Sequence, residues 1–238
     1  MKKQALLAAV ALVAPVMLGT GVSAASTTAP AANANSASTT MSATFTAPTN
    51  GGTNPTPPSP TTPGGNPSQP GNTPLNPTGS FGIAYVPASF NFGSSAISGS
   101  GELNVQTTVA NGRTYNVGVK NNTHSSDGWT LNANLTGDLA QKYGAKIKTQ
   151  TTLNSVKVNN GNNSLTNVPT NTVTNTANYA ITANQTPVMQ IASNKVLAGT
   201  FDLNLGSSVT LNIPDSSTLK AGTYNGTVNW NLATVPTP

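Results

Sequence analysis

The sequence has no cysteine, a single histidine and few charged residues, which make up 6% of its 238 positions. The missing cysteines exclude disulfides, thiolate metal sites and lipid attachment through a cysteine. Many small secreted domains depend on disulfides, so this chain must be stabilised by the burial of apolar surface alone. A folded part of about 160 residues can bury roughly 70% of its extended-chain surface, which makes a disulfide dispensable.

Groups that could carry a reaction are also scarce. His124 lies in a polar segment without an evident nucleophile or orienting partner. A hydrolase that cleaves glycans would need two carboxylates flanking a glycosidic bond. Two acids could meet in space, but each has an ordinary structural place, such as the outward-facing strand position of Asp202. We expect no catalysis, no cofactor and no metal site. The five acids are Glu102, Asp127, Asp138, Asp202 and Asp215.

Basic residues outnumber acidic ones by ten to five, and removal of Lys2 and Lys3 with a signal peptide would leave a net charge of +3. The basic residues do not cluster with aromatics, so we expect no nucleic-acid partner. A mild positive charge could favour an anionic wall or membrane surface. We instead interpret the one local concentration as solvent-facing strand residues, namely Lys142, Lys146, Lys148 and Lys157.

The first 24 residues have the pattern of a cleavable signal peptide. Two lysines precede an apolar stretch over residues 5–18, and small residues follow at 22–24, so we predict cleavage after Ala24. The apolar stretch is shorter than the roughly 20 residues that span a bilayer core. We therefore expect a secreted protein without an integral membrane anchor after signal cleavage.

The last residues, 233–238, carry neither an apolar tail nor a basic cluster. A sortase sorting signal for covalent wall attachment needs both. From the sequence we therefore expect that any retention at the cell surface is non-covalent.

Residues 25–78 offer almost nothing to bury. Ala, Ser and Thr dominate up to Thr46, and proline and glycine dominate from there to Thr78. Such composition cannot offset the entropy of ordering and favours extended, partly polyproline II chain. We predict a disordered Pro/Thr/Gly-rich linker over residues 25–78 that holds the folded part at a distance.

From Gly79 onward, apolar residues recur at every second position. Asn, Thr and Asp separate them in runs around Leu103, Val117, Leu131 and Leu203. Strict alternation predicts strands with one buried face and one solvent-facing side. The sequence therefore predicts one all-β domain over residues 79–238, a two-sheet β-sandwich of antiparallel strands.

Turn and helix signals are compatible with this fold. Asn111-Gly112 predicts a hairpin with a two-residue type I′ turn, and Asn160-Gly161 is a second hairpin signal. Residues 138–143 predict one helical turn that Gly144 ends.

Both tryptophans occur as Trp-x-Leu, at residues 129–131 and 230–232. On a strand, residues two positions apart point to the same face. A large aromatic beside a leucine is typical of a sandwich core, whereas an exposed ring could stack on sugars. Because the neighbours on the same face are apolar, we favour the core interpretation for both tryptophans.

Three segments resemble motifs of the WxL domain family, over about Gly79 to Val235. Residues 221–232 resemble the family's closing motif, and residues 128–133 its upstream Trp-x-Leu motif. Residues 84–93, a Val-Pro followed by Phe-Gly, are similar to its opening segment. One departure is Asn225-Gly226, where family members tend to have strand formers, and this dipeptide favours a bulge at Tyr224.

The resemblance implies a surface protein of Gram-positive bacteria, held non-covalently on peptidoglycan, with other WxL-type surface proteins as partners. Our leading hypothesis is a non-catalytic, cell-wall-associated protein. The alternative is an adhesin or a component of a surface complex whose main ligand is a protein, and the third is a small wall hydrolase. The motif residues, with a core or a wall-binding role, are Trp129, Leu131, Tyr224, Trp230 and Leu232.

Overall fold

The computed structural model describes residues 39–49, 51–61, 71–97, 99–107, 112–161, 164–169 and 172–235. The chain divides into two units, and the second, residues 46–238, contains the β-fold. In the first unit, the described residues 39–45 are exposed and form neither helix nor strand. The predicted signal peptide, residues 1–24, lies outside the described residues.

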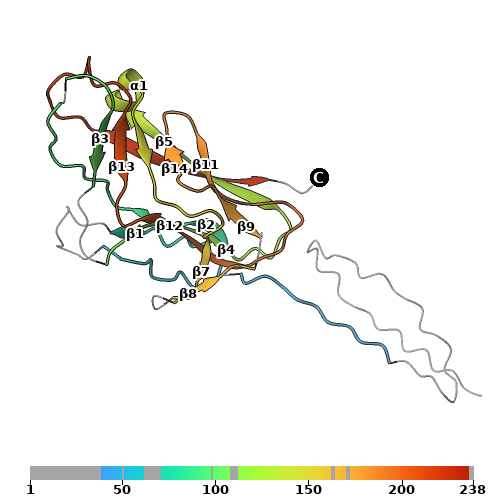
Figure 1. Ribbon diagram of the computed structural model, residues 1–238. Coiled ribbons are helices and arrows are strands. Elements are labelled where there is room, and N and C mark those ends of the chain that lie inside the picture. Colours follow the sequence, from blue (N-terminus) through green and yellow to red (C-terminus); the bar gives the residue numbers. More distant parts are fainter. Residues whose placement is uncertain are drawn as a thin grey trace, which may run out of the picture. The chain divides into compact units, whose positions relative to one another are not determined.

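Antiparallel strands form three sheets, which confirms the predicted all-β class (Figure 1). The β4 sheet has six strands in the order β1 (Asn72–Pro74), β2 (Phe81–Pro87), β4 (Tyr115–Asn121), β12 (Gly199–Gly206), β7 (Lys157–Asn159) and β8 (Leu165–Asn167). The β5 sheet has four, in the order β14 (Gly226–Val235), β5 (Gly128–Gly137), β11 (Thr186–Ile191) and β9 (Val173–Asn175). The β13 sheet also has four, in the order β10 (Ala180–Ile181), β6 (Lys146–Lys148), β13 (Thr210–Ile213) and β3 (Leu103–Gln106).

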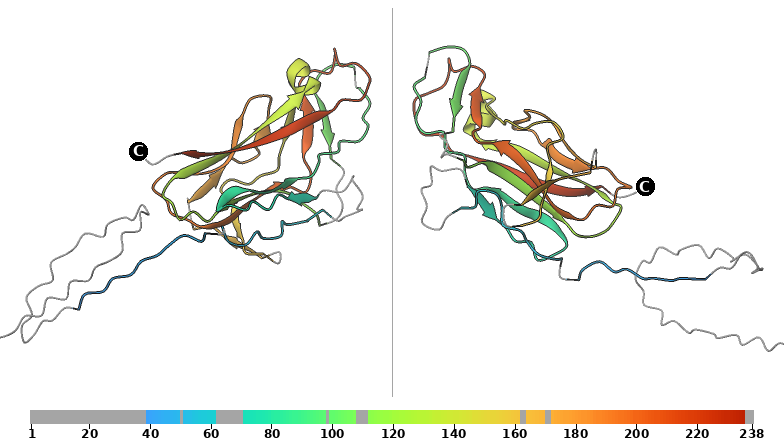
Figure 2. Two further views of the ribbon diagram at one scale, coloured as in Figure 1. Left: turned by 180° about the vertical axis from the view of Figure 1, so that it is seen from behind. Right: turned by 60° about the horizontal axis from the view of Figure 1, so that its bottom comes forward.

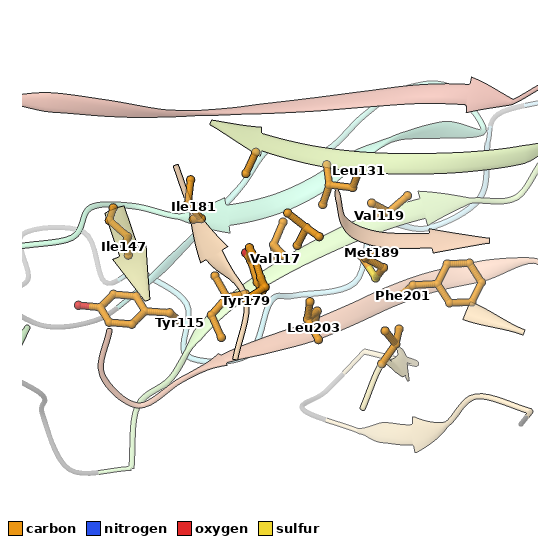
Figure 3. Close-up of a cluster of buried hydrophobic side chains, with 14 of the residues drawn as sticks. Tyr115, Val117, Val119, Leu131, Ile147, Tyr179, Ile181, Met189, Phe201 and Leu203 are labelled. Atoms are coloured by element: carbon orange, nitrogen blue, oxygen red, sulfur yellow. The ribbon is translucent and has the colours of Figure 1, made fainter. Parts of the chain in front are cut away.

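The apolar core lies between the β4 sheet and the β5 sheet, which face each other as two layers (Figure 3). Side chains of the β13 sheet also enter this core. Burial of this shared apolar surface is what holds the three sheets together without a disulfide. The core side chains include Val117 and Val119 of β4, Leu131 of β5, Met189 of β11, Phe201 and Leu203 of β12, Ile147 of β6 and Ile181 of β10.

The helix and one of the two hairpins form where the sequence predicts them. Helix α1 (Asp138–Tyr143) ends at Gly144, whose φ of 62° is the left-handed conformation that glycine adopts readily. Strands β7 and β8 pair across the loop that contains Gly161. The hairpin predicted at Asn111-Gly112 is different, because the strands on its two sides enter different sheets. β3 pairs with β13, whereas β4 pairs with β2 and β12; Asn111 itself lies outside the described residues.

Strand β5 shows the predicted alternation, but β4 does not. In β5, Leu131 and Ala133 are buried and Asn132 between them is partly exposed. All seven residues of β4 are buried, including Asn116 and Lys120 on its outer side. The cause is a segment of irregular chain, residues 51–61, which covers this outer face of the β4 sheet and which we call the strap.

The strap falls within the range that the sequence assigns to the linker, as does β1, which pairs with β2. Proline has no N–H to donate, so a proline-rich segment presents mainly carbonyl acceptors. The β4 sheet and its margins supply side-chain donors for these carbonyls, at distances from 2.6 to 3.1 Å. These hydrogen bonds run from the side chain of Asn122 to the carbonyl of Gly51, and likewise from Lys120 to Gly52, from Asn159 to Thr56, from Asn72 to Pro58, and from Arg113 to Ser59 and Pro60.

The strap also changes the environment of Asp202 on β12. The sequence places this residue at an outward-facing position, yet it is 1% exposed, since the outward face is covered. Its carboxylate accepts hydrogen bonds from the Tyr85 hydroxyl at 2.8 Å and from Asn116 Nδ2 at 2.9 Å. Burial raises the pKa of Asp202 to about 6, against the lowering effect of these hydrogen bonds and of Lys157.

Candidate functional site

The two Trp-x-Leu motifs lie on neighbouring strands. β14 pairs with β5 along its whole length, with Leu232 opposite Leu131 and Trp230 opposite Ala133. Residues directly opposite each other in an antiparallel pair project from the same face of the sheet. Both motifs therefore direct their Trp and Leu side chains to the inner face. The structure brings four of the five motif residues together, and Tyr224 precedes β14.

Trp129 is a core residue. It is 1% exposed, and its ring lies 5.8 Å from that of Phe201 on the facing β12. Leu131 beside it is fully buried. No described residue accepts a hydrogen bond from Trp129 Nε1, so this indole contributes through its apolar area rather than through its polar atom. A ring in this position is out of reach of a wall polymer.

Trp230 has a different environment, although it projects from the same face. β14 is the outermost strand of its sheet, next to β5 (Figure 2). A side chain on an edge strand has a neighbouring strand on one side only, and Trp230 and Leu232 are accordingly half-buried. The rest of the Trp230 ring surface is open to a groove.

This groove has a volume of about 1110 Å³ and lies beside the closing motif. It is lined by Val228 and Trp230 of β14 and by apolar residues of the β13 sheet such as Ile147 and Leu211. Of the described residues that line it, Lys220 alone is charged. We call it the Trp230 groove. It is mostly apolar with amide and hydroxyl groups at its margin, as small-molecule sites usually are.

Tyr224 also lines the Trp230 groove. The alternation pattern placed it in the last strand, but β14 begins only at Gly226. Tyr224 instead lies in the preceding loop, where its hydroxyl donates to the carbonyl of Lys220 at 2.9 Å. Its ring packs edge-on against Tyr143 of α1, with 5.9 Å between ring centroids. The loop is thus fixed against the helix, and Tyr224 is held at the groove margin.

The opening segment also lines the groove. Phe90 and Phe92, half-buried, line it together with the rest of residues 87–97. Phe90 packs edge-on against Tyr115 of β4, at 5.0 Å between centroids. The sequence marked this segment only through its resemblance to a family motif. Alternation could not identify it as part of a site, because residues 88–97 form no strand and meet β14 only in three dimensions.

The acidic residues are dispersed, and each has a structural contact. Asp138 forms an exposed ion pair with Lys142 at 2.8 Å, and Glu102 one with Lys148 at 2.9 Å, which lowers the pKa of Glu102. Asp215 Oδ1 accepts from the backbone N–H of Ser217, and Asp127 Oδ2 from the Ser125 hydroxyl. Asp202 is buried under the strap. None of the five lines the Trp230 groove.

Two further properties bear on the function. Within the part of the chain that the structure describes, no three His, Cys, Asp or Glu side chains gather as a metal site would require. Nor does any helix there have the length and apolar character needed to cross a bilayer. Two of the four lysines interpreted as solvent-facing, Lys142 and Lys157, are exposed, and the other two, Lys146 and Lys148, are partly exposed.

Comparison with known proteins bears directly on these motifs. The family model described as "WxL domain surface cell wall-binding" matches residues 32–236, which is most of the chain. No curated protein and no solved structure gave a match. The matched range includes the opening segment, both Trp-x-Leu motifs and the strap. The chain therefore belongs to the WxL domain family of surface cell-wall-binding proteins.

Proposed function

We propose that this chain is a non-catalytic surface protein that binds peptidoglycan non-covalently through the Trp230 groove. Export would follow from cleavage of the predicted signal peptide after Ala24, in a Gram-positive cell. The observation that carries the proposal is the meeting of two family motifs, the opening segment and the closing motif, in the lining of one groove.

The chemistry of the groove fits a wall glycan. A sugar ring has an apolar face that packs on an aromatic ring, and hydroxyl and N-acetyl groups at its rim that need hydrogen-bond partners. Trp230 and Phe90, which both line the groove, offer the first kind of surface. Asn91, Thr136 and Asn225 line the same groove with amide and hydroxyl groups. Lys220 could pair with a carboxylate of the wall peptide.

The same geometry supports a binding role without catalysis. Hydrolysis of a glycosidic bond would need two carboxylates about 5 to 10 Å apart on either side of the bond. The described lining of the groove has no acidic residue, and the five acids hold turns, ion pairs and the strap-covered network elsewhere. We accordingly propose that the wall polymer is bound and left intact.

Sedimentation with insoluble peptidoglycan tests the proposal. Trp230→Ala removes the ring from the groove and should weaken binding by at least about tenfold, as loss of a central aromatic commonly does. Asn134→Ala is the matched control, because Asn134 lies on the neighbouring strand β5 and projects from the opposite, outer face. Equal sedimentation of the two variants, both shown to be folded by thermal unfolding, would reject the groove as the binding site.

A protein ligand remains the second candidate, and the outer face of the β5 sheet favours it. Asn132 and Asn134 of β5 are paired there with the exposed Asn231 and Asn229 of β14, which makes a flat, uncharged, polar surface. Such a surface suits another surface protein, including a second WxL-type protein. Binding to walls stripped of protein, at the affinity found for intact walls, would argue against this candidate.

A further inference from the structure

Strand β14 differs from every other sheet edge in the described structure. The three sheets have six edge strands, and five of them, β1, β3, β8, β9 and β10, are only two to four residues long. β14 is ten residues long and, among the described residues, pairs with β5 alone. Proteins usually protect a sheet edge by making it short or by placing proline or charged residues on it.

β14 has none of these protective features. Its sequence, Gly-Thr-Val-Asn-Trp-Asn-Leu-Ala-Thr-Val, contains no charged residue and no proline. Alternate residues on its inner face, Val228, Trp230 and Leu232, are half-buried and would gain cover from a further strand. The free backbone groups along ten residues form a template for main-chain hydrogen bonds.

The order of residues in β14 is nearly symmetrical about Trp230. Residues 227–233 read Thr-Val-Asn-Trp-Asn-Leu-Ala, so that each residue has a similar one at the same distance on the other side of the tryptophan. β5 has the same property about Ala133, which is opposite Trp230: residues 130–136 read Thr-Leu-Asn-Ala-Asn-Leu-Thr. β14 already pairs with a strand of this pattern on one side, placing Asn opposite Asn and Leu opposite Leu or Val.

We propose that the free edge of β14 binds β14 of a second copy of this chain, antiparallel, with Trp230 opposite Trp230 of the partner subunit. In this register Asn229 lies opposite Asn231 of the partner subunit, and Val228 opposite Leu232 of the partner subunit. The two β5 sheets become one continuous eight-stranded sheet related by a twofold axis. The Asn–Asn pairs and the Val–Leu pairs then repeat the types of pair that β14 makes with β5, and the central pair joins two tryptophans.

The pairing is independent of the wall ligand but would change how the wall is bound. Both Trp230 side chains project from the inner face of the joined sheet, so the two Trp230 grooves lie next to each other across the twofold axis. A dimer that engages one polymer at two adjoining grooves gains avidity without any new contact to the polymer. The association itself is measured in solution without wall material, so its outcome is separate from that of the binding experiment above.

Two double variants test both the association and its register by analytical ultracentrifugation of the chain from Ala25 onward. Asn229→Lys with Asn231→Lys places lysine opposite lysine twice in the proposed dimer. Asn229→Lys with Asn231→Glu, the matched control, places lysine opposite glutamate twice. In the monomer both variants face the uncharged Asn134 and Asn132, so both should fold.

The wild-type chain should show a concentration-dependent monomer–dimer equilibrium. The Lys/Lys variant should dissociate at least about tenfold more readily, whereas the Lys/Glu variant should associate as well as the wild type or better. A wild-type chain that stays monomeric at every concentration would overturn the proposal. So would equal association of the two variants, because the contact would then lie elsewhere.

The absence of cysteine allows a second, independent measurement. A mixture of Asn229→Cys chains and Asn231→Cys chains should form disulfide-linked dimers on mild oxidation, because these positions face each other across the interface. Each single variant alone should cross-link much less, since its own copies are offset by two residues along the strands, which is beyond the usual reach of a disulfide. Cross-linking that is no greater in the mixture than in the separate pools would contradict the register.

Discussion

The two Trp-x-Leu motifs of this protein have nearly the same local sequence and lie on adjacent strands, yet they have different environments. β5 has a strand on each side, and its motif is closed off in the core against β12. β14 has a strand on one side, and its motif borders the Trp230 groove. Position in the sheet, rather than the motif, thus decides whether the tryptophan stabilises the fold or is available to a ligand.

The largest expected contrast comes from deleting each tryptophan. Trp129→Ala should lower the free energy of unfolding by about 3–5 kcal/mol, because it leaves a cavity in a closed core. Trp230→Ala should lower it by about 1–2 kcal/mol, since that ring is only partly buried. Chemical denaturation of both variants measures the difference. Equal losses would mean that the two environments are energetically the same.

The leucines of the two motifs give a closer comparison, because Leu131 and Leu232 are directly opposite each other on β5 and β14. Leu131→Ala should cost about 2–5 kcal/mol and Leu232→Ala about 1 kcal/mol, in proportion to the apolar area that each removes from the buried interior. The same denaturation experiment applies. A larger loss at Leu232 would show that β14 is covered by something else in solution, such as the second copy proposed above.

The response to pH should separate the region under the strap, which contains Asp202, from the Trp230 groove. Burial raises the pKa of Asp202 from 3.8 to about 6, so the folded state binds this proton more tightly than the unfolded chain does. The stability from this proton is complete below about pH 4 and is lost as the pH rises through about 6, by up to about 3 kcal/mol.

Asp202→Asn should therefore flatten the stability of the protein between pH 4 and 6 in thermal unfolding. Wall binding by this variant should match that of the wild type across the range, because no described residue lining the Trp230 groove has a carboxylate or an imidazole. A variant that keeps the full pH slope would place the titrating group elsewhere.

Much of the architecture follows from periodicity and turn chemistry. Alternation identified β5 and β12, and the glycine after Tyr143 identified the end of α1. Which strands pair is a different matter, since pairing depends on contacts between distant residues. Asn111-Gly112 is a strong local hairpin signal, but the strands around it find better partners in separate sheets.

The strap and the groove show why composition alone misjudges some segments. Residues 51–61 have little to bury, and a reading of their side chains predicts disorder. Their binding depends on backbone carbonyls and on donors such as Lys120 and Asn159, which are remote in sequence. Likewise, Phe90 becomes part of a site only because the fold brings it into the lining of the same groove as Trp230. Family resemblance marked the segment, whereas physical pattern did not.

The strap also determines how the fold would respond to tension. A pull on the chain before Gly51 reaches the β4 sheet through hydrogen bonds to the strap, each contributing about 1 kcal/mol, before it reaches any apolar core. The strap would then detach first and lengthen the chain while the β-sandwich and the Trp230 groove remain folded. Detachment would let water reach the buried carboxylate of Asp202, so the mechanical state of the protein could be followed through the protonation of this one group.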